Sequence, residues 1–350
     1  MSSERINPVL VEALRGATRE SAHRGSVAVL DADGKCIVAL GDIERPVFPR
    51  SAVKLLQAIP LVESGAADRL GLDDEELAIA CASHAGEPRH VAVVERMLAK
   101  AGLDVGALEC GTHWPRIGPV AHALAASGRE PNALNNNCSG KHAGFLCLAC
   151  VLCGGVNLRQ YAKGYVAPRH PVMRAITEAL EATTGHDLRE APRGIDGCSI
   201  PAFAIPLDRL ALAFARVGSE TGLRPGHMRA ATRLRKAVAR HPFMAAGSDR
   251  FDTTVMEALG ERVYCKVGAE AVFCASFPDR GLGVTIKIDD GNTARAAEVA
   301  MAAAIEAFVD LDDEEAAVLR RLSEVSLRNW NGIEVGALRA SEELRNGLQG

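Results

Sequence analysis

Segments with β-strand patterns occur near both ends of this chain, and helical patterns occupy the sequence between them. Residues 26–30 and 36–40 are apolar runs on either side of Asp33-Gly34, a pair typical of a tight β-hairpin turn. Near the other end, strand-like runs separated by short turns lie at residues 262–268, 271–275 and 283–288. We therefore predict an α+β fold, with one antiparallel sheet built from both ends of the chain and a mainly helical lobe inserted.

The predicted helices define the inserted lobe. Helical periodicity occurs at residues 72–82, 91–101, 171–183, 207–217 and 226–239, and an apolar run after residue 144 is expected to form a buried helix ending at Gly154-Gly155. We also expect a short helix at residues 8–18, a loop from 111 to 131 and an alanine-rich helix at residues 293–308. These elements predict a single domain over residues 1–350, with the sheet lobe at 1–45 and 260–350 and the helical lobe at 46–259.

The charge and cysteine content limit the classes of partner and the compartment. The net charge of the 350 residues is −4, which gives no basic surface for nucleic acid. No uncharged apolar run is long enough to cross a bilayer, and residues 1–5 lack an apolar signal core. We expect a cytoplasmic protein with a small-molecule partner, no membrane contact, and ten cysteines that are reduced thiols.

The stretch around Ser51 carries the strongest chemical signal. Ser51 and Lys54 are three residues apart, so on a helix the amine would lie over the hydroxyl. A serine hydroxyl is a weak nucleophile at neutral pH, and a buried lysine is one way to activate it. The Ser-x-x-Lys motif occurs in serine acyl-transfer enzymes such as β-lactamases and penicillin-binding proteins. A helix N-cap serine followed by a solvated lysine would have the same spacing.

A second serine and a second lysine complement this pair. Ser83 lies in a loop of small residues, and Lys266-Val267-Gly268 is similar to the Lys-Thr-Gly strand of the same enzymes. Val267 lacks the hydroxyl that those enzymes direct at a carboxylate, which makes a β-lactam substrate doubtful. Two serine–lysine pairs in one pocket would lower each other's lysine pKa by repulsion between the cations.

Two further stretches gather side chains that are typical of a site. Residues 135–144 read Asn-Asn-Asn-Cys-Ser-Gly-Lys-His-Ala-Gly, a composition that suits neither a strand nor a helix interior. Asp196-Gly197-Cys198 is a turn that holds a carboxylate and a thiol close together. An elaborate N-cap with a core cysteine would explain the first stretch, but its density of Cys, Lys and His favours a site.

Taken together, these motifs resemble the class 3, rhizobial-type L-asparaginases, which form the asparaginase II family. The motifs that carry the resemblance are Arg50-Ser51-Ala52-Val53-Lys54, Ser83-His84-Ala85-Gly86, residues 137–144, Asp196-Gly197-Cys198 and the strand with Lys266. The resemblance implies hydrolysis of L-asparagine to L-aspartate and ammonia, a serine β-lactamase-like fold and a homodimer.

The resemblance also implies roles for individual residues. Ser51 would be the nucleophile with Lys54 as its base, and Ser83 with Lys266 would form a supporting dyad. One zinc ion per chain, placed for binding rather than as the hydrolytic metal, would be held by Cys138, Lys141 and Cys198. The substrate would contact Arg50, His84, His142 and Asp196.

Three other functions remain open from the sequence. A glutaminase would share the fold and the dyads. A penicillin-binding or β-lactamase-like acyl hydrolase would share the Ser-x-x-Lys motif. A zinc-stabilised binding protein would have kept the fold without activity, although both serine–lysine pairs are intact in this chain.

Overall fold

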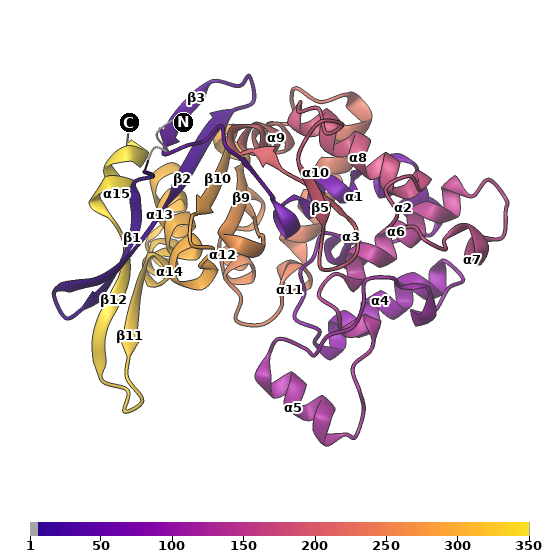
Figure 1. Cartoon of the computed structure of the whole chain (residues 1–350), viewed down its shortest axis with the longest axis horizontal. Coiled ribbons are helices and arrows are strands. Elements are labelled where there is room, and N and C mark those ends of the chain that lie inside the picture. Colours follow the sequence, from indigo (N-terminus) through magenta and orange to yellow (C-terminus); the bar gives the residue numbers. More distant parts are fainter. Residues whose placement is uncertain (1–5, 350) are drawn as a thin grey trace.

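The computed structural model describes residues 6–349 and contains an eight-stranded antiparallel sheet at one side of the molecule (Figure 1). The strand order is β11-β12-β1-β2-β10-β9-β8, with β3 paired to β2, so strands from both chain ends meet in one sheet. The bounds are β1 Val9–Arg15, β2 Thr18–Asp31, β3 Cys36–Leu40, β8 Tyr264–Val267, β9 Val272–Phe277, β10 Leu282–Ile288, β11 Glu324–Arg328 and β12 Glu334–Ala340. The predicted α+β architecture is confirmed. Residues 1–5, in which the sequence predicted no signal core, lie outside the described residues.

The helix predicted at residues 8–18 is wrong, because this segment forms strand β1. Val11 and Ala13 are fully buried, and β1 pairs antiparallel with β2 on one side and with β12 on the other. Val11, for example, lies opposite Ala340 in the register. One partner, β2, follows β1 directly, but the other, β12, comes from the far end of the sequence, so the periodicity of residues 8–18 alone did not indicate a central strand.

Helix α9 (Leu207–Ser219) packs directly on strands β2, β9 and β10, although its residues fall within the predicted helical lobe. Its close approach depends on Gly283, where a Cβ would lie 2.0 Å from the Ala211 carbonyl oxygen and 2.3 Å from the Ala215 nitrogen. Thr285, on the same face of β10, donates its hydroxyl to the Leu207 carbonyl oxygen at 2.7 Å. Three further helices pack against strands of the sheet, namely α13 (Glu298–Phe308), α14 (Asp313–Ser323) and α15 (Glu342–Gln349).

The helical lobe is organised around α1 (Lys54–Glu63), whose residues 54–61 are all buried. Helices packed around α1 are α3 (Asp74–Ala80), α6 (Ser139–Leu152), α8 (Pro171–Thr184) and α10 (Pro225–Arg240). The remaining helices of this lobe are α2 (Ala66–Arg69), α4 (Pro88–Lys100), α7 (Leu158–Tyr161), α11 (Pro242–Ala245) and α12 (Phe251–Leu259). Two short antiparallel strand pairs connect loops of this lobe. They are β4 (Pro46–Val47) with β7 (Ile205–Pro206), and β5 (Arg193–Ile195) with β6 (Pro201–Phe203).

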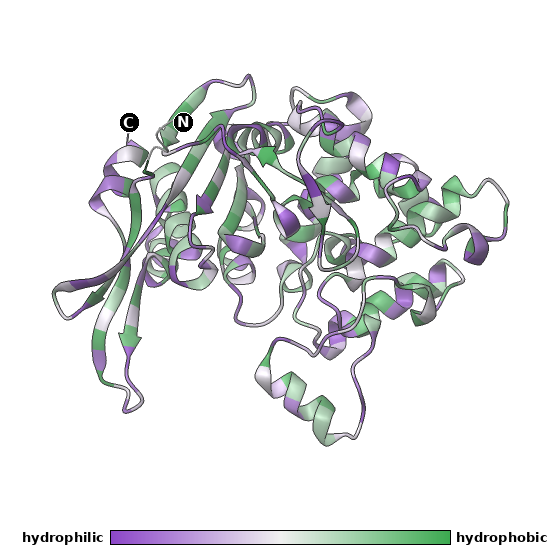
Figure 2. Cartoon of the chain, viewed as in Figure 1, coloured by the Kyte–Doolittle hydropathy of each residue, from purple (hydrophilic) through white to green (hydrophobic). Residues whose placement is uncertain are grey.

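The predicted loop at residues 111–131 contains a helix, α5 (Gly118–Ala126). This helix stands away from the body of the molecule, is largely apolar and has no buried residue (Figures 1 and 2). The prolines and glycines at residues 115–119 contributed to the prediction of a loop. In the structure they lie just before α5 or in its first turn, where proline is tolerated. Within residues 6–349, no helix has both the length and the apolar character needed to span a membrane.

Candidate active site

Ser51 lies in a 3-10 turn (Arg50–Val53) that runs directly into α1. Arg50 has a left-handed backbone (φ 51°), which is uncommon for a residue with a side chain. The end of strand β8 packs against this turn at Gly268, where a Cβ would lie 2.4 Å from the Pro49 carbonyl oxygen and 3.2 Å from the Ala52 nitrogen. The absence of a side chain at residue 268 therefore allows the sheet to reach Ser51.

The Lys54 side chain is buried beneath the site and points at Ser83. Its Nζ donates to the Ser83 Oγ at 3.0 Å and also to the Ala82 carbonyl oxygen. Lys54 is 1% exposed, and burial, with further contributions from the charges of Lys141 and Lys266, lowers its pKa from 10.5 to about 8. The hydrogen bond to Ser83 differs from the expected pairing of Lys54 with Ser51.

Lys266 pairs with a residue that sequence reasoning missed. Its Nζ donates to the Asp252 Oδ2 at 3.0 Å and to the Val267 carbonyl oxygen at 3.1 Å, and both charged side chains are almost completely buried. The expected partner, Ser83, is instead held by Lys54. Asp252 belongs to α12, a segment without a recognisable catalytic motif, so no sequence signal indicated this ion pair.

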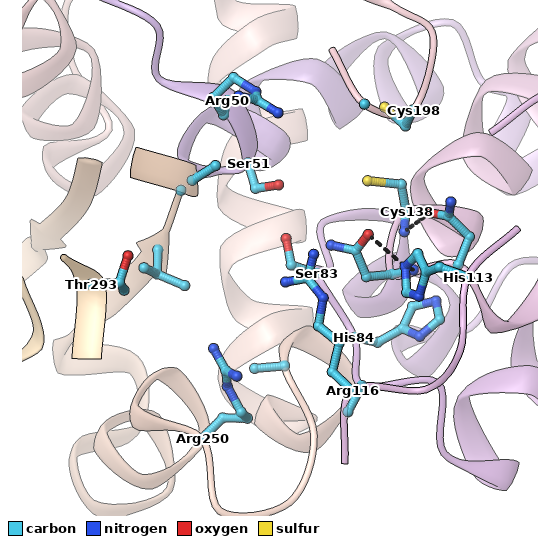
Figure 3. Close-up of a pocket in the computed structure, with 18 of the residues that line it drawn as sticks. Arg50, Ser51, Ser83, His84, His113, Arg116, Cys138, Cys198, Arg250 and Thr293 are labelled. Atoms are coloured by element: carbon cyan, nitrogen blue, oxygen red, sulfur yellow. Dashed lines mark hydrogen bonds between the residues drawn. The ribbon is translucent and has the colours of Figure 1, made fainter. Parts of the chain in front are cut away.

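A cavity of about 450 Å³ brings the two serines together. Ser51 and Ser83 both line it, and in Figure 3 their hydroxyls point into the same space. Lys54 and Lys266 lie behind the wall rather than in it. The volume falls in the range of small-molecule sites, and it exceeds what a few water molecules need.

Arg50 and Asp196 form a two-point ion pair at the edge of this cavity. The Arg50 Nε and Nη2 each donate to one Asp196 oxygen at 3.0 Å. Burial opposes ionisation of Asp196, but the bonds from Arg50 and the nearby charge of Lys141 outweigh it and lower the Asp196 pKa. The pair fastens the Asp196-Gly197-Cys198 turn to the Ser51 turn, so two predicted motifs meet here.

The three predicted zinc ligands also meet. Cys138 and Cys198 line the cavity, and the Lys141 Nζ donates to the Cys198 Sγ at 3.1 Å. A hydrogen bond with Cys198 lowers the Cys138 pKa well below its ordinary value. Burial disfavours the Lys141 charge, but Cys138 and Cys198 outweigh burial and raise the Lys141 pKa. Two sulfur donors and an amine are a donor set that fits a soft divalent cation. Within residues 6–349, no cluster of three or more His, Cys, Asp or Glu side chains is arranged for a metal, so a metal here would depend on Lys141.

The two histidines predicted to bind the substrate are both hydrogen-bonded to other groups of the protein. The His84 Nδ1 accepts from the Gly86 N–H at 3.1 Å, and its Nε2 lies 2.9 Å from the Ser139 Oγ. His142 is fully buried, its Nδ1 lies 2.6 Å from the Tyr165 hydroxyl, and it does not line the cavity. Burial is the main cause that lowers both histidine pKa values, so both rings are neutral near pH 7. His84 nevertheless lines the cavity, whereas the contacts of His142 fit a role in holding the loops together.

Several further cavity residues were missed from the sequence. They are His113, Arg116, Arg250, Thr293 and Glu298, whereas Asn136, which also lines the cavity, belongs to the predicted stretch of residues 135–144. Arg250 precedes α12 and Glu298 begins α13, and each is a single charged residue without a motif around it. Only their placement in space assigns them to the site.

The comparison with protein families agrees with the family suggested by the motifs. The family model of L-asparaginase II matches residues 11–340. A protein provisionally described as a β-lactamase from Bacteroides dorei DSM 17855 is 14% identical, with 77% of this chain and 86% of that chain covered and a TM-score of 0.40. A simvastatin synthase variant from Aspergillus terreus is 12% identical, with 75% and 86% covered and a TM-score of 0.39. A β-lactamase from Mycobacterium bovis is 15% identical, with 79% and 90% covered and a TM-score of 0.36.

A comparison with curated proteins gave no significant match. The family match is independent of the site geometry and extends over nearly all of the residues from which that geometry is built. The chain therefore belongs to the L-asparaginase II family of amidohydrolases.

Proposed function

We propose that this protein hydrolyses L-asparagine to L-aspartate and ammonia through an acyl-enzyme intermediate. The buried amine of Lys54 carries the proposal, because it is hydrogen-bonded to Ser83 in the wall of a cavity that Ser51 also lines. A lysine with a pKa of about 8 can accept a proton near neutral pH, which an ordinary lysine rarely does.

Ser51 is the proposed nucleophile. No hydrogen bond within residues 6–349 engages its hydroxyl, whereas the Ser83 hydroxyl is committed to Lys54. The Ser51 Oγ attacks the side-chain amide carbon of asparagine, and Lys54 takes the serine proton directly or through the Ser83 hydroxyl. That proton passes to the amide nitrogen, ammonia leaves, and an ester joins the aspartyl group to Ser51.

Water then hydrolyses the ester, and Lys54 takes the proton of the attacking water before returning it to Ser51. Lys266 supports this cycle through its ion pair with Asp252, because its charge helps to lower the Lys54 pKa. Backbone N–H groups at the Ser51 turn stabilise the negative charge that develops on the amide oxygen.

Cys138, Lys141 and Cys198 are the proposed zinc ligands. When bound, zinc would supply a fixed positive charge at the cavity wall for substrate placement. Lys141 would have to lose its proton to bind the metal, and the two thiols would have to ionise.

Ammonia release separates this proposal from a glutaminase and from a binding protein. The wild-type protein should release ammonia from L-asparagine faster than from L-glutamine, and Ser51→Ala should abolish release while keeping the circular dichroism spectrum. Faster release from glutamine would make the protein a glutaminase, and no release from either amide would leave a binding protein. Labelling by a fluorescent penicillin would favour the β-lactamase-like alternative.

The acyl-enzyme can be located by acid quenching and mass spectrometry. Trypsin separates the two serines, because Arg50, Lys54, Arg69 and Arg89 bracket them. The aspartyl group is expected on the peptide of residues 51–54. Its recovery on the peptide with Ser83, together with substantial turnover by Ser51→Ala, would reassign the nucleophile to Ser83.

A further inference from the structure

Arg250 and Glu298 form a charged end of the cavity that the proposed chemistry does not use. Both side chains line the cavity, and within residues 6–349 neither forms a side-chain hydrogen bond or an ion pair. Arg50, by contrast, is already bound at two points by Asp196. In Figure 3 the Arg250 guanidinium points into the cavity from the side opposite Arg50, and the serine hydroxyls lie between them.

The loop that carries Arg250 is fastened to the segment that carries Ser83. The Ser83 N–H donates to the Ala245 carbonyl oxygen at 2.9 Å, and the Ser248 N–H and hydroxyl each donate to Glu87 at 2.9 Å. Gly247 has φ +114°, and a Cβ there would lie 2.6 Å from the Glu87 Oε1. These contacts hold the backbone that carries Arg250 in a fixed position relative to the segment of Ser83, as the support of a specificity-determining group must.

Glu298 supplies the opposite charge at the same end. It begins α13, next to the segment in which Thr293 and Ala294 line the cavity. Burial and the nearby Asp252 raise the Glu298 pKa, and the positive charge of Arg250 acts against them. One cation and one anion thus face the same end of the cavity, each without a protein partner.

We propose that Arg250 binds the α-carboxylate of the substrate and that Glu298 binds its α-ammonium group. The inference rests on the proposed amidase function and specifies its substrate class as zwitterionic α-amino acids with a side-chain amide. Such a substrate carries both charges on one carbon, and its amide carbonyl then extends toward Ser51 and Ser83. A guanidinium without a partner is suited to two-point binding of a carboxylate.

Competition against L-asparagine hydrolysis tests each contact separately. The competitors are L-aspartate, β-alanine, which lacks the α-carboxylate, and succinate, which lacks the α-ammonium group. Arg250→Ala should weaken inhibition by L-aspartate and by succinate by ~10- to 100-fold, the range expected for lost hydrogen bonds to a charged group. The same variant should change inhibition by β-alanine much less. Glu298→Gln should weaken inhibition by L-aspartate and by β-alanine, and should change inhibition by succinate much less.

Matched variants separate this specific loss from a general one. Arg250→Lys should restore part of the affinity for L-aspartate, because lysine keeps the positive charge but lacks the two-point donor geometry of a guanidinium. Arg229→Ala, an exposed arginine on α10 outside the cavity, should behave as wild type. Thermal melts establish that each variant is folded, and a parallel titration monitored by the melting temperature gives L-aspartate binding without turnover.

Equal weakening of all three competitors by Arg250→Ala would overturn the assignment, and so would a selective loss in Arg116→Ala in place of Arg250→Ala. Complete failure of the proposed function would look different, because the wild-type protein would then release no ammonia from L-asparagine. In that case the melting-temperature titration decides: stabilisation by L-aspartate that is lost in Arg250→Ala supports the contact, and equal stabilisation of both proteins refutes it.

Discussion

The protonation state of Lys54 sets the expected pH dependence of the enzyme. At pH 7.5 a lysine with the ordinary pKa of 10.5 is neutral in roughly one molecule in a thousand, whereas one with a pKa of about 8 is neutral in roughly one in four. The lowered pKa of Lys54 therefore raises the fraction of active base by roughly 240-fold, which corresponds to about 3 kcal/mol. The base acts when deprotonated, so activity must increase as the pH rises through this pKa.

The assay is ammonia release from L-asparagine between pH 6 and pH 10. We expect kcat/KM to rise about tenfold per pH unit at the acidic end and to level off above about pH 8, because kcat/KM reports groups of the free enzyme. Zinc at Cys138 and Cys198 would add positive charge near Lys54 and lower its pKa further, so the metal-free protein gives the cleaner test. Lys54→Arg should be inactive throughout, because arginine stays protonated.

A second variant tests the cause of the shift. The double variant Lys266→Met/Asp252→Asn removes a nearby cation without leaving a buried carboxylate alone, so the Lys54 pKa and the inflection of the profile should move upward. A wild-type profile that is flat from pH 6 to pH 10, or an inflection near 10.5, would refute the assignment of Lys54 as the base.

Two other predictions concern the metal and the core. Protein purified without chelator should contain about one zinc per chain by elemental analysis, and Cys138→Ala should contain much less; metal-free wild-type protein would contradict the ligand set. Gly283→Ala should lower the free energy of unfolding by roughly 2 kcal/mol or more in urea titrations, because its Cβ would meet the α9 backbone at 2.0 Å. Gly118→Ala, with no atom within 4 Å of its Cβ, is the matched control, and equal losses in the two variants would show that the contact with α9 is not the cause.

The parts of the fold that could be predicted have local causes. Asp33-Gly34 favours a hairpin by its own backbone preferences, and the structure has one between β2 and β3. The acidic pair Asp73-Asp74 indicated the start of α3 without deciding which of the two is the cap, and in the structure Asp73 forms a capping box with Glu76. Strand β1 is different, because it pairs with its neighbour β2 on one side but with β12, from the other end of the chain, on the other.

The site, like the fold, has features that local sequence predicts and features that depend on tertiary packing. The Ser51–Lys54 spacing predicted the helical turn, but it did not predict that the amine would extend past Ser51 to Ser83, because that depends on where α1 meets the loop after α3. Asp252, Arg250 and Glu298 stand alone in the sequence and come from α12 and α13. Only tertiary packing brings them beside the motifs.

The balance of buried charge explains why Lys54 is the base among the lysines of this site. Three lysines are almost fully buried in the described chain, namely Lys54, Lys141 and Lys266. Lys266 has the Asp252 carboxylate, and Lys141 is held in its charged form by Cys138 and Cys198. The hydrogen-bond partners of Lys54 are a carbonyl oxygen and a hydroxyl, which are both neutral. Cys138 acts to raise the Lys54 pKa, but burial, with repulsion from the other two lysines, outweighs it and lowers that pKa. A buried cation without a carboxylate partner is the one that gives up its proton most readily, so the two paired lysines make the third a base.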